Sequence, residues 1–375
     1  MKITVTSVRG LTLHPSRCYD YEFENVLVDV AGATLLDLSA IPTALGAVPA
    51  FMDGLFRTVG FERRKMPKFV SDRVAPDQDL FVMNCQMLDD LHVLNGVPNW
   101  RSNSRFAVCW IKELFAKGPH PVELLRILDR FDLVILNFEG SVEYLRKQMN
   151  RAAVMHLPLG IDAVQFCPFP RPPRPVIDVY WMGRIAPAHH HALQTEAERN
   201  GLFYMFNSTW AENVTEPREH RVLRSRLIKH TALFGVQPAK FNEPEVVGKQ
   251  SEIGFRYFEG AAAGAALIGH AARAPSFDEI FPWDDAVIEM PDAADELVPF
   301  IRDLLAQRDR LERIRRDSVT HCLTHHDWLY RLYAIFDQLA LPTDSIQPAL
   351  DARQGQLQAL AAEAARGRLG GMQAS

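Results

Sequence analysis

Short apolar runs alternate with segments of helical spacing along the first half of the chain. Strands are expected at residues 3–8, 34–38, 80–84, 106–111 and 133–137, and helices at residues 21–30, 121–131 and from Ser141 onward. This alternation is typical of a parallel sheet covered by helices on both faces, because each helix returns the chain to the same edge of the sheet. Residues 45–79 do not follow the pattern and are interpreted as a loop-rich insertion.

A proline-rich segment separates this series from a second one. Residues 166–175, FCPFPRPPRP, contain five prolines, which favour an extended and stiff connection. Beyond it, strands are expected at residues 176–182, 202–206, 231–236, 265–268 and 286–290, helices at 191–200 and 217–230, and further helices after residue 293, including 327–340 and 346–366. A chain of 375 residues is also longer than one typical core. The sequence therefore predicts an α/β fold with domains at residues 1–165 and 176–325, and C-terminal helices and a tail at 326–375.

One stretch of the second series, SEIGFRYFEGAAAGAALIG at residues 251–269, combines charges with very small side chains. With Ser251 as the N-cap of a helix over residues 252–263, Glu252, Arg256 and Glu259 share one helical face. The small residues allow this helix to lie close to a sheet. A helix N-terminus favours a phosphate, and Glu259 would lie roughly 10 Å further along the axis at 1.5 Å per residue.

That spacing is about the distance from a diphosphate to the ribose of a nucleotide, so the face is a candidate nucleotide site. A structural interpretation carries equal weight from this stretch alone. Glu252, Arg256 and Glu259 could instead form surface ion pairs at i,i+3 and i,i+4, each contributing a few tenths of a kcal/mol.

Composition excludes several other classes of protein. The net charge is −5, with 41 basic and 46 acidic side chains, which gives no argument for nucleic acid as a partner. The five cysteines are scattered and show no C-x-x-C spacing, so reduced thiols are expected and a structural zinc site is not. There is no signal peptide pattern and no run of 18 apolar residues. A cytoplasmic protein is expected, with peripheral contact to the inner face of the membrane left open.

Two groups of histidines are candidate metal ligands but favour other interpretations. His189, His190 and His191 are adjacent, so their side chains diverge, and a solvated loop is expected there. His321 and His325 form an i,i+4 pair beside His326, but no H-E-x-x-H motif accompanies them, so packing is expected. The sequence therefore predicts no metal.

Two further segments, LPLGIDAVQFCPF at residues 157–169 and VYWMGR at 179–184, strengthen the nucleotide interpretation. Together with residues 251–269, they resemble the GT-B glycosyltransferases of the family-4 type, whose P-x-G-[IV]-D-x-x-x-F-x-P segment joins two facing Rossmann-like domains across a cleft. The form FRYFEGAAAG and the later HCLTHHDWLYRL are similar to the CgeB-like group of these enzymes. The resemblance covers roughly residues 155–337.

This resemblance implies an activity and its substrates. It implies transfer of a sugar from a nucleoside diphosphate sugar to an acceptor, with retention at the anomeric carbon and without a metal or other cofactor. The acceptor it implies is a glycan or lipid-linked glycan, as in polysaccharide biosynthesis. Two alternatives stay open: a catalytically inactive nucleotide-sugar-binding or scaffold protein of the same fold, and a nucleotide-sugar epimerase.

The resemblance also implies a set of site residues. Catalytic roles are expected for Glu252, Arg184 and Lys240, and donor contacts for Gly183, Arg184, Asn207, Ser208, Ser251, Glu252, Gly254, Phe255, Arg256 and Glu259. The chain departs from the family pattern at two points. Ser251 stands at the place of the first of two glutamates. No lysine follows Gly183–Arg184, so Lys240, Lys249 or Arg256 is expected to supply the second cation.

The first domain is expected to supply the acceptor side of the cleft. Lys112, Glu113 and Glu139 follow apolar strands, and ligands of α/β folds lie beyond the carboxyl ends of strands. A solvated loop has equal weight for these residues. Asp162 is interpreted as a structural residue that caps or turns the connection between domains.

Overall fold

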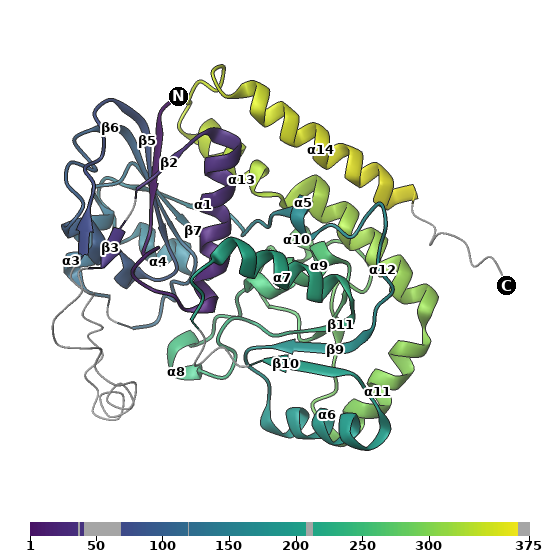
Figure 1. Ribbon diagram of the computed structural model, residues 1–375. Helices are drawn as coiled ribbons and strands as arrows, with labels where there is room; N and C mark the ends of the chain where they lie inside the picture. Colours follow the sequence, from purple (N-terminus) through teal and green to yellow (C-terminus); the bar gives the residue numbers. More distant parts are fainter. Residues whose placement is uncertain (37, 41–68, 119, 208–212, 367–375) are drawn as a thin grey trace.

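Two parallel sheets form the framework of the protein (Figure 1). The computed structural model describes residues 1–36, 38–40, 69–118, 120–207 and 213–366. The first sheet has the order β2-β1-β5-β6-β7-β8, and the second has the order β10-β9-β11-β12-β13. Their strands are β1 (Ile3–Thr6), β2 (Thr34–Leu35), β5 (Gln78–Cys85), β6 (Ser104–Ile111), β7 (Leu133–Leu136), β8 (Ala153–His156), β9 (Ile177–Met182), β10 (Tyr204–Asn207), β11 (Thr231–Val236), β12 (Ala266–Gly269) and β13 (Ile288–Glu289).

In each sheet the strand order changes direction next to the strand that comes first in the sequence, β1 or β9. In the second sheet the reversal lies between β9 and β11, and in the first between β1 and β5. The crevice at such a point, beyond the carboxyl ends of the strands, is where open α/β sheets bind ligands. A small antiparallel pair, β3 (Leu38–Ala40) with β4 (Phe69–Ser71), stands apart from both sheets.

Helices cover both faces of each sheet. In β9, alternate residues enter different clusters: Val179 and Trp181 pack with the residues of α6 and α11, and Tyr180 and Met182 with those of α7 and α9. The helices are α1 (Cys18–Ala31), α3 (Val122–Leu128), α4 (Val142–Arg146), α5 (Ala163–Phe166), α6 (Pro187–Asn200), α7 (Pro217–Lys229), α8 (Pro244–Val247), α9 (Phe255–Ala263), α10 (Phe277–Ile280), α11 (Ala294–Ala306), α12 (Arg308–His321), α13 (Trp328–Gln338) and α14 (Gln347–Arg366). Short 3-10 segments are η1 (Pro15–Arg17), η2 (Leu88–Asn95) and η3 (Glu139–Ser141), and Cys322–His326 forms a π-helical turn, η4.

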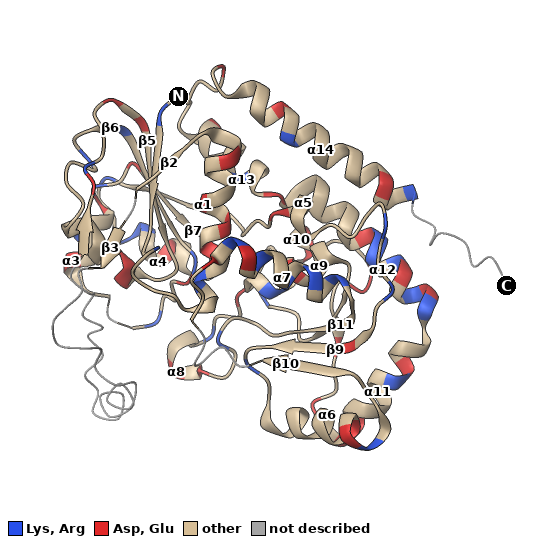
Figure 2. Ribbon diagram, in the orientation of Figure 1, with Lys and Arg blue, Asp and Glu red and all other residues tan. Residues whose placement is uncertain are grey.

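The two halves of the chain meet through helices and through the loops at the carboxyl ends of their strands. Helix α1 packs against α7, and Figure 2 shows basic segments of α7 and α9 near acidic segments of α1. Beyond β6, the Ala116 amide donates to the Gln250 side chain (2.7 Å) and Lys117 donates to the Pro244 carbonyl (3.1 Å). The carboxyl edges of the two sheets therefore face each other.

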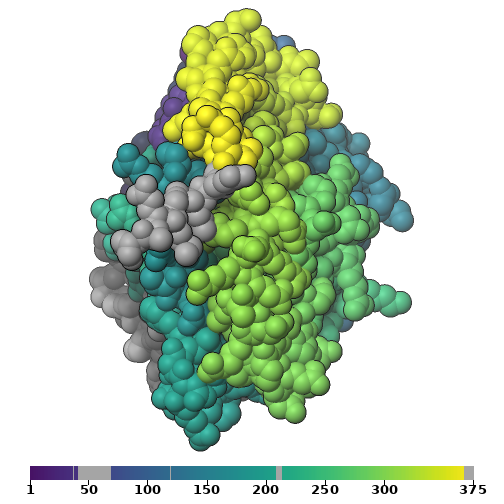
Figure 3. Space-filling model, turned by 90° about the vertical axis from the view of Figure 1, so that its right-hand side faces the viewer, coloured from purple at the N-terminus to yellow at the C-terminus, as the bar shows by residue number. Residues whose placement is uncertain are grey.

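The C-terminal helices return to the first half of the chain. Helix α13 packs on α1, and α14 packs on both α1 and α12. Figure 3 shows α14 (yellow) and α12 (green) on one continuous face of the molecule. Ile161 forms a parallel bridge with Asp327, and Arg353 of α14 bonds both Asp162 and Asp327 at 2.6 Å. The connection between the domains is thus held by the helices that follow the second domain.

The close approach of a helix to the sheet, expected from the small residues of the 251–269 stretch, is confirmed. A Cβ atom at Gly260 would lie 2.4 Å from Leu267 Cδ2 and 2.7 Å from Phe234 Cδ1. Only a residue without a side chain lets α9 pack at this distance from β11 and β12.

Most predicted elements are present, and the differences occur at their ends. The predicted α/β architecture is confirmed, whereas β8 was missed. The helices predicted after residue 293 begin with α11 and α12, which are separate helices that meet at Gln307. Most of the predicted insertion at 45–79 lies outside the described residues, although β4 and the start of β5 fall inside it. The predicted domain boundaries stay predictions.

In the described part of the chain, no helix combines the length and apolar character that a membrane span requires.

Candidate functional site

Helix α9 begins three residues later than the sequence pattern predicts. Its first residue is Phe255, and its N-cap is Gly254, which has an extended backbone. The prediction of Ser251 as the N-cap is wrong: the Ser251 hydroxyl instead accepts a hydrogen bond from the Arg273 amide (3.0 Å). The reason is a tertiary contact, since the Glu252 carbonyl accepts from the Ala239 amide (2.9 Å) and so holds the chain against the loop after β11.

This shift changes the geometry of the charged face. Glu252 precedes the helix, so the predicted common helical face with Arg256 and Glu259 is wrong. Glu259 lies four residues beyond Phe255, about 6 Å along the axis at 1.5 Å per residue. The first turn of α9 and Glu259 are therefore closer together than predicted.

Two glycines near this helix border open space. Gly183 follows β9 with φ +87°, and a Cβ atom placed there would meet nothing within 4 Å. A Cβ atom at Gly254 would meet only Ala239 Cβ, at 4.0 Å. A ligand can therefore approach the backbone at both positions, and at Gly254 it would meet the unpaired amides of the first turn of α9.

Glu259 is completely buried and is held by two arginines. Arg221 of α7 contacts Oε1, and Arg256 donates to Oε2 at 2.6 Å. Burial would raise the pKa of this carboxyl, but Arg256, Arg221 and Arg224 together lower the pKa to about 2. The alternative of a surface ion pair between Arg256 and Glu259 is thus half right: the pair exists, but it is buried.

Arg221 connects Glu259 to the first domain. Its Nε donates to Glu22 of α1 at 2.7 Å, and both side chains are only 4 % exposed. Glu22 also accepts from the Trp328 indole (2.9 Å) and from the Asp162 amide (2.8 Å). One carboxylate therefore joins α1, the interdomain connection, α7 and α13.

A second arginine of α7 extends this cluster toward the end of β10. Arg224 contacts the Tyr180 hydroxyl and donates to Asn207 Oδ1 at 3.3 Å, and the Tyr180 hydroxyl donates to the same oxygen at 3.2 Å. Asn207, a predicted donor contact, is thus placed near Glu259 through Arg224. Ser208, the next predicted contact, lies outside the described residues.

Arg184 and Lys240 follow the two strands beside the reversal point of the second sheet. Arg184 pairs with Glu243, and its side chain is 35 % exposed, so this cation is accessible. Lys240 Nζ lies 3.9 Å from Glu113 Oε2 of the first domain. Both predicted cations therefore lie at the carboxyl edge of the second sheet.

Glu252 points toward the first domain. Its Oε1 accepts from the Gly140 amide (3.1 Å) and from the Gln250 side chain (2.8 Å), and burial raises its pKa. Nearby, the Asn137 side chain donates to the Ile253 carbonyl (3.3 Å). The segment before α9 is thus bonded to the loop after β7.

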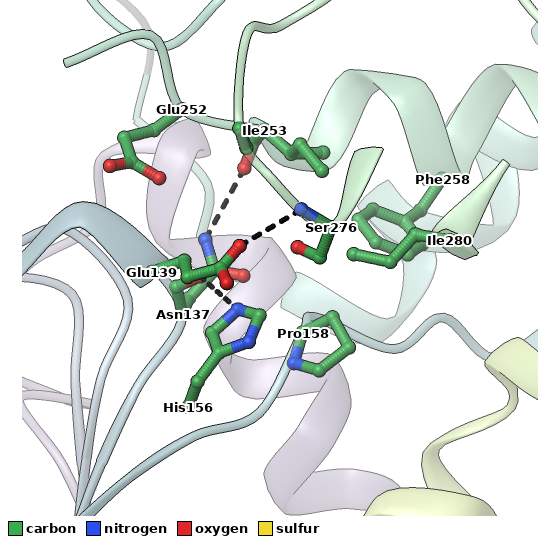
Figure 4. A pocket seen from close by; sticks show the side chains of 10 residues that line it. Asn137, Glu139, His156, Pro158, Glu252, Ile253, Phe258, Ser276 and Ile280 are labelled. Atoms are coloured by element: carbon green, nitrogen blue, oxygen red, sulfur yellow. Dashed lines mark hydrogen bonds between the residues drawn. The ribbon is translucent and has the colours of Figure 1, made fainter. Parts of the chain in front are cut away.

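A narrow pocket lies where these segments meet (Figure 4). It encloses about 210 Å³ between atoms, with no room for a water-sized sphere. Both domains contribute to its lining: Asn137, Glu139, His156 and Pro158 from the first half of the chain, and Glu252, Ile253, Phe258, Ala274, Ser276 and Ile280 from the second. The candidate site therefore extends from Glu259 along the start of α9 to Glu252. This pocket lies at the Glu252 end of the site.

Part of the second half of the chain matches a known family in sequence. Residues 190–337 match the model of a family described as glycosyl transferase-like, and this match includes α7, α9 and Glu259. Crystal structures of Alr3699/HepE from Anabaena share the fold. The complex with UDP and glucose has a TM-score of 0.51 at 14 % identity, covering 91 % of this chain and 99 % of that one. The complex with UDP-glucose has a TM-score of 0.50 at the same identity and coverage.

The chain therefore shares the GT-B fold of these structures, and its residues 190–337 are similar to a glycosyl transferase-like family. The predictions of this fold and of this class of enzyme are thereby confirmed, whereas membership of the CgeB-like group stays a prediction. No curated protein matches the sequence of this chain.

Sequence reasoning missed the two buried arginines of α7. Arg221 and Arg224 lie in PREHRVLRSRLIK, which was read only as a charged helix. A signal was available, because the two arginines are three residues apart and share a face with the apolar Ile228, the face that packs inward.

On the acceptor side, Lys112 is less accessible than predicted. It is buried, and its Nζ lies 3.4 Å from the centre of the Trp110 ring. Burial lowers the pKa of Lys112 to about 7. Glu113 accepts from the Gln86 side chain (3.0 Å) and remains near Lys240.

The predicted structural roles of other polar residues are mostly confirmed. Asp162 caps α5 by accepting from the Gln165 amide (3.0 Å). His326 is buried and contacts the Ile280 carbonyl (2.7 Å), which agrees with packing. The prediction of a solvated loop at His189–His191 is wrong, because Pro187 starts α6 and His189 is buried against the Asp292 carbonyl. No group of metal-ligating side chains converges in the part of the chain that the structure describes.

Proposed function

We propose that the protein transfers a sugar from a nucleoside diphosphate sugar to a hydroxyl acceptor. The observation that carries this proposal is the buried, ionised Glu259, one turn inside a helix whose N-terminus borders open space at Gly254. A carboxylate offers about four lone-pair sites, and the two arginines occupy two of them. Two remain for the neighbouring hydroxyls of a ribose.

The diphosphate of the donor then lies between the start of α9 and Arg184. Backbone amides and the helix dipole favour negative charge there, and a guanidinium forms paired hydrogen bonds with phosphate oxygens. Lys240 contributes a second cation as the diphosphate leaves, so the reaction needs no metal. Gly183, Phe255 and Arg256 border this position, Asn207 and Ser208 are assigned to the nucleoside end, and Ser251 and Glu252 to the transferred sugar.

UDP is the first nucleotide to test, because the Anabaena protein of the same fold was crystallised with UDP and UDP-glucose. The acceptor is proposed to be a glycan or lipid-linked glycan. Release of UDP from UDP-sugars distinguishes this enzyme from an inactive nucleotide-sugar-binding protein.

Arg184→Ala is expected to weaken UDP binding about tenfold while leaving uridine binding within twofold, because only the diphosphate loses a charge-assisted hydrogen bond. Titration calorimetry with both ligands measures this difference. Arg199→Ala, at the exposed end of α6, is the matched control. An equal loss for UDP and uridine would contradict the assignment of Arg184 to the diphosphate.

Transfer is expected to retain the anomeric configuration of the donor. This proposal rests on the similarity of residues 158–168 to the segment that joins the domains in retaining family-4 enzymes. Proton NMR of the first product formed from an α-linked UDP-sugar measures the configuration directly. A β-linked first product would refute retention while leaving the proposed sugar transfer intact.

A further inference from the structure

A second cavity lies at the other edge of the second sheet, where strands β9 and β10 begin. It holds about 200 Å³ and opens on the surface. A cavity of roughly 150 Å³ is known to hold benzene, so this one has room for a sugar ring. Its walls come from β9, from α11 and from the turn between α6 and β10, and they comprise Asp178, Asn200, Gly201, Leu202, Arg302 and Leu305.

This cavity is separate from the proposed donor site. Asp178 is the second residue of β9, whereas Gly183 follows the last residue of that strand. A strand rises about 3.3 Å per residue, so the two positions lie roughly 16 Å apart. A ligand in this cavity is therefore outside the cleft between the domains.

A buried carboxylate fixes two polar side chains of the wall. Glu196 of α6 is 7 % exposed. It accepts from Asn200 Nδ2 at 2.7 Å and from Arg302 Nε at 2.6 Å, across the contact between α6 and α11 (Figure 1). These hydrogen bonds from Asn200 and Arg302 hold the pKa of Glu196 below its usual value, so the carboxylate stays ionised. Both wall residues are thus positioned before a ligand arrives.

The wall also has hydrogen-bonding capacity that the protein leaves unused. Asp178 Oδ2 accepts from the Phe203 amide (2.8 Å). In the described part of the chain, Asp178 Oδ1, Asn200 Oδ1 and Arg302 Nη1 have no protein partner. The two oxygens can accept hydrogen bonds, and the guanidinium nitrogen can donate them. Since a hydroxyl group does both, a ligand with several hydroxyls matches this set.

The charge of the wall disfavours an anionic ligand. Arg302 is already paired with Glu196, and Asp178 adds a second carboxylate. Two carboxylates against one guanidinium leave an excess of negative charge, so a phosphate or a sugar acid is repelled. The cavity therefore fits a neutral sugar ring and not a nucleotide.

An exposed aromatic side chain lies beside the cavity. Phe203 follows Leu202 directly before β10 and is 51 % exposed. The hydrogen bond from its amide to Asp178 places this residue at the rim. The C–H face of a sugar packs on an aromatic ring and leaves the hydroxyls at its edge for polar partners. A second sugar of a chain can therefore stack on Phe203 while the first occupies the cavity.

We propose that this cavity and Phe203 bind two neighbouring sugars of a neutral glycan, outside the site of sugar transfer. The inference goes beyond the proposed function, and binding here does not depend on it. A glycan held at the amino ends of β9 and β10 stays on the protein whether the donor site is empty or occupied.

The test titrates the full chain with the neutral trisaccharides maltotriose, cellotriose and chitotriose, and with trigalacturonate as the anionic counterpart. At least one neutral trisaccharide is expected to bind with a Kd below about 10 mM, and trigalacturonate about tenfold more weakly. Saturation-transfer NMR detects binding of this strength. Saturating UDP should leave the sugar affinity unchanged, because the two sites are separate.

Two variants divide the cavity from the aromatic ring. Arg302→Met keeps an apolar stem but loses the donor, so it is expected to weaken the neutral trisaccharide about tenfold. Phe203→Ala is expected to weaken the trisaccharide about fivefold and to leave the matching methyl glycoside unaffected, since only the second sugar meets the ring. Arg126→Met, on the exposed side of α3, is the matched control.

Asp178→Asn tests the same wall without removing a partner of Glu196. It keeps an acceptor for the Phe203 amide but removes the charge, so the preference for the neutral sugar over trigalacturonate is expected to fall about tenfold. This variant decides the question even if Arg302→Met folds poorly.

Any of four results overturns the inference: no neutral trisaccharide binds, trigalacturonate binds equally well, UDP competes with the sugar, or both wall variants, Arg302→Met and Asp178→Asn, behave as wild type. Failure to bind any nucleoside diphosphate refutes the proposed function instead and leaves this glycan site standing.

Discussion

Arg221→Met is expected to lower the free energy of unfolding by about 3–5 kcal/mol, since removing one partner of a buried ion pair leaves an uncompensated charge. Here two carboxylates lose the same cation. Glu22 and Glu259 are 4 % and 0 % exposed, and neither can turn toward solvent without opening the contact between α1, α7 and α9. Urea denaturation followed by circular dichroism measures the change.

Arg218→Met on the same helix is the matched control. Arg218 also forms a bidentate pair with α1, through Asp29, but both side chains are more than half exposed. Such surface pairs contribute about 0–1 kcal/mol. Equal losses for the two variants would show that the buried network does not stabilise the fold more than a surface pair does.

Acid should remove the contribution of Glu259 to this network late in a titration. The pKa of Glu259 is about 2 in the folded chain and has an ordinary value of 4.5. Because the folded value is the lower one, its contribution to stability is complete above pH 4.5 and is lost as the pH falls toward 2.

Glu259→Gln is expected to reduce the affinity for UDP by about 10–100-fold. Hydrogen bonds to a charged group contribute about 1.5–3 kcal/mol, and each 1.4 kcal/mol is a factor of ten in Kd. An amide offers one acceptor oxygen instead of two, and Arg221 and Arg256 compete with the ribose for it. Calorimetric titration with UDP at neutral pH gives the Kd.

The Glu22→Gln variant distinguishes a loss of UDP binding from a loss of fold stability. It removes a carboxylate partner of the same Arg221, so both variants leave that arginine partly uncompensated. Glu22 belongs to α1 and has no proposed contact with the nucleotide. UDP affinity should therefore stay within about threefold in Glu22→Gln. Equal losses of affinity in the two variants would refute the ribose role of Glu259.

The position of α1 has a consequence for how the donor enters. Tyr19 of α1 stacks on Phe255, the first residue of α9, with ring centres 4.9 Å apart. Arg221 joins Glu22 to Glu259 directly behind this contact. The donor site proposed here therefore lies beneath α1, and α1 must separate from α7 and α9 when a nucleotide binds.

How far the sequence predicts the site differs from residue to residue. Arg256 and Glu259 were found from a three-residue spacing in one helix, and their pairing needs only that helix to form. Glu252 is different, since its interpretation depended on where the helix begins. A hydrogen bond between Ala239 and Glu252 decides that point, and the sequence contains no local sign of it.

The sequence by itself determined the two α/β series, their proline-rich connection, and a helix of small residues able to lie on a sheet. These features follow from the periodicity of neighbouring residues, which a short window contains. The tertiary structure alone decided the Arg221 network and the pocket around His156. Arg221 is 199 residues from Glu22, and Glu139 is 137 residues from Ser276. Such pairs form only when two separately patterned domains pack together, so no local pattern encodes them.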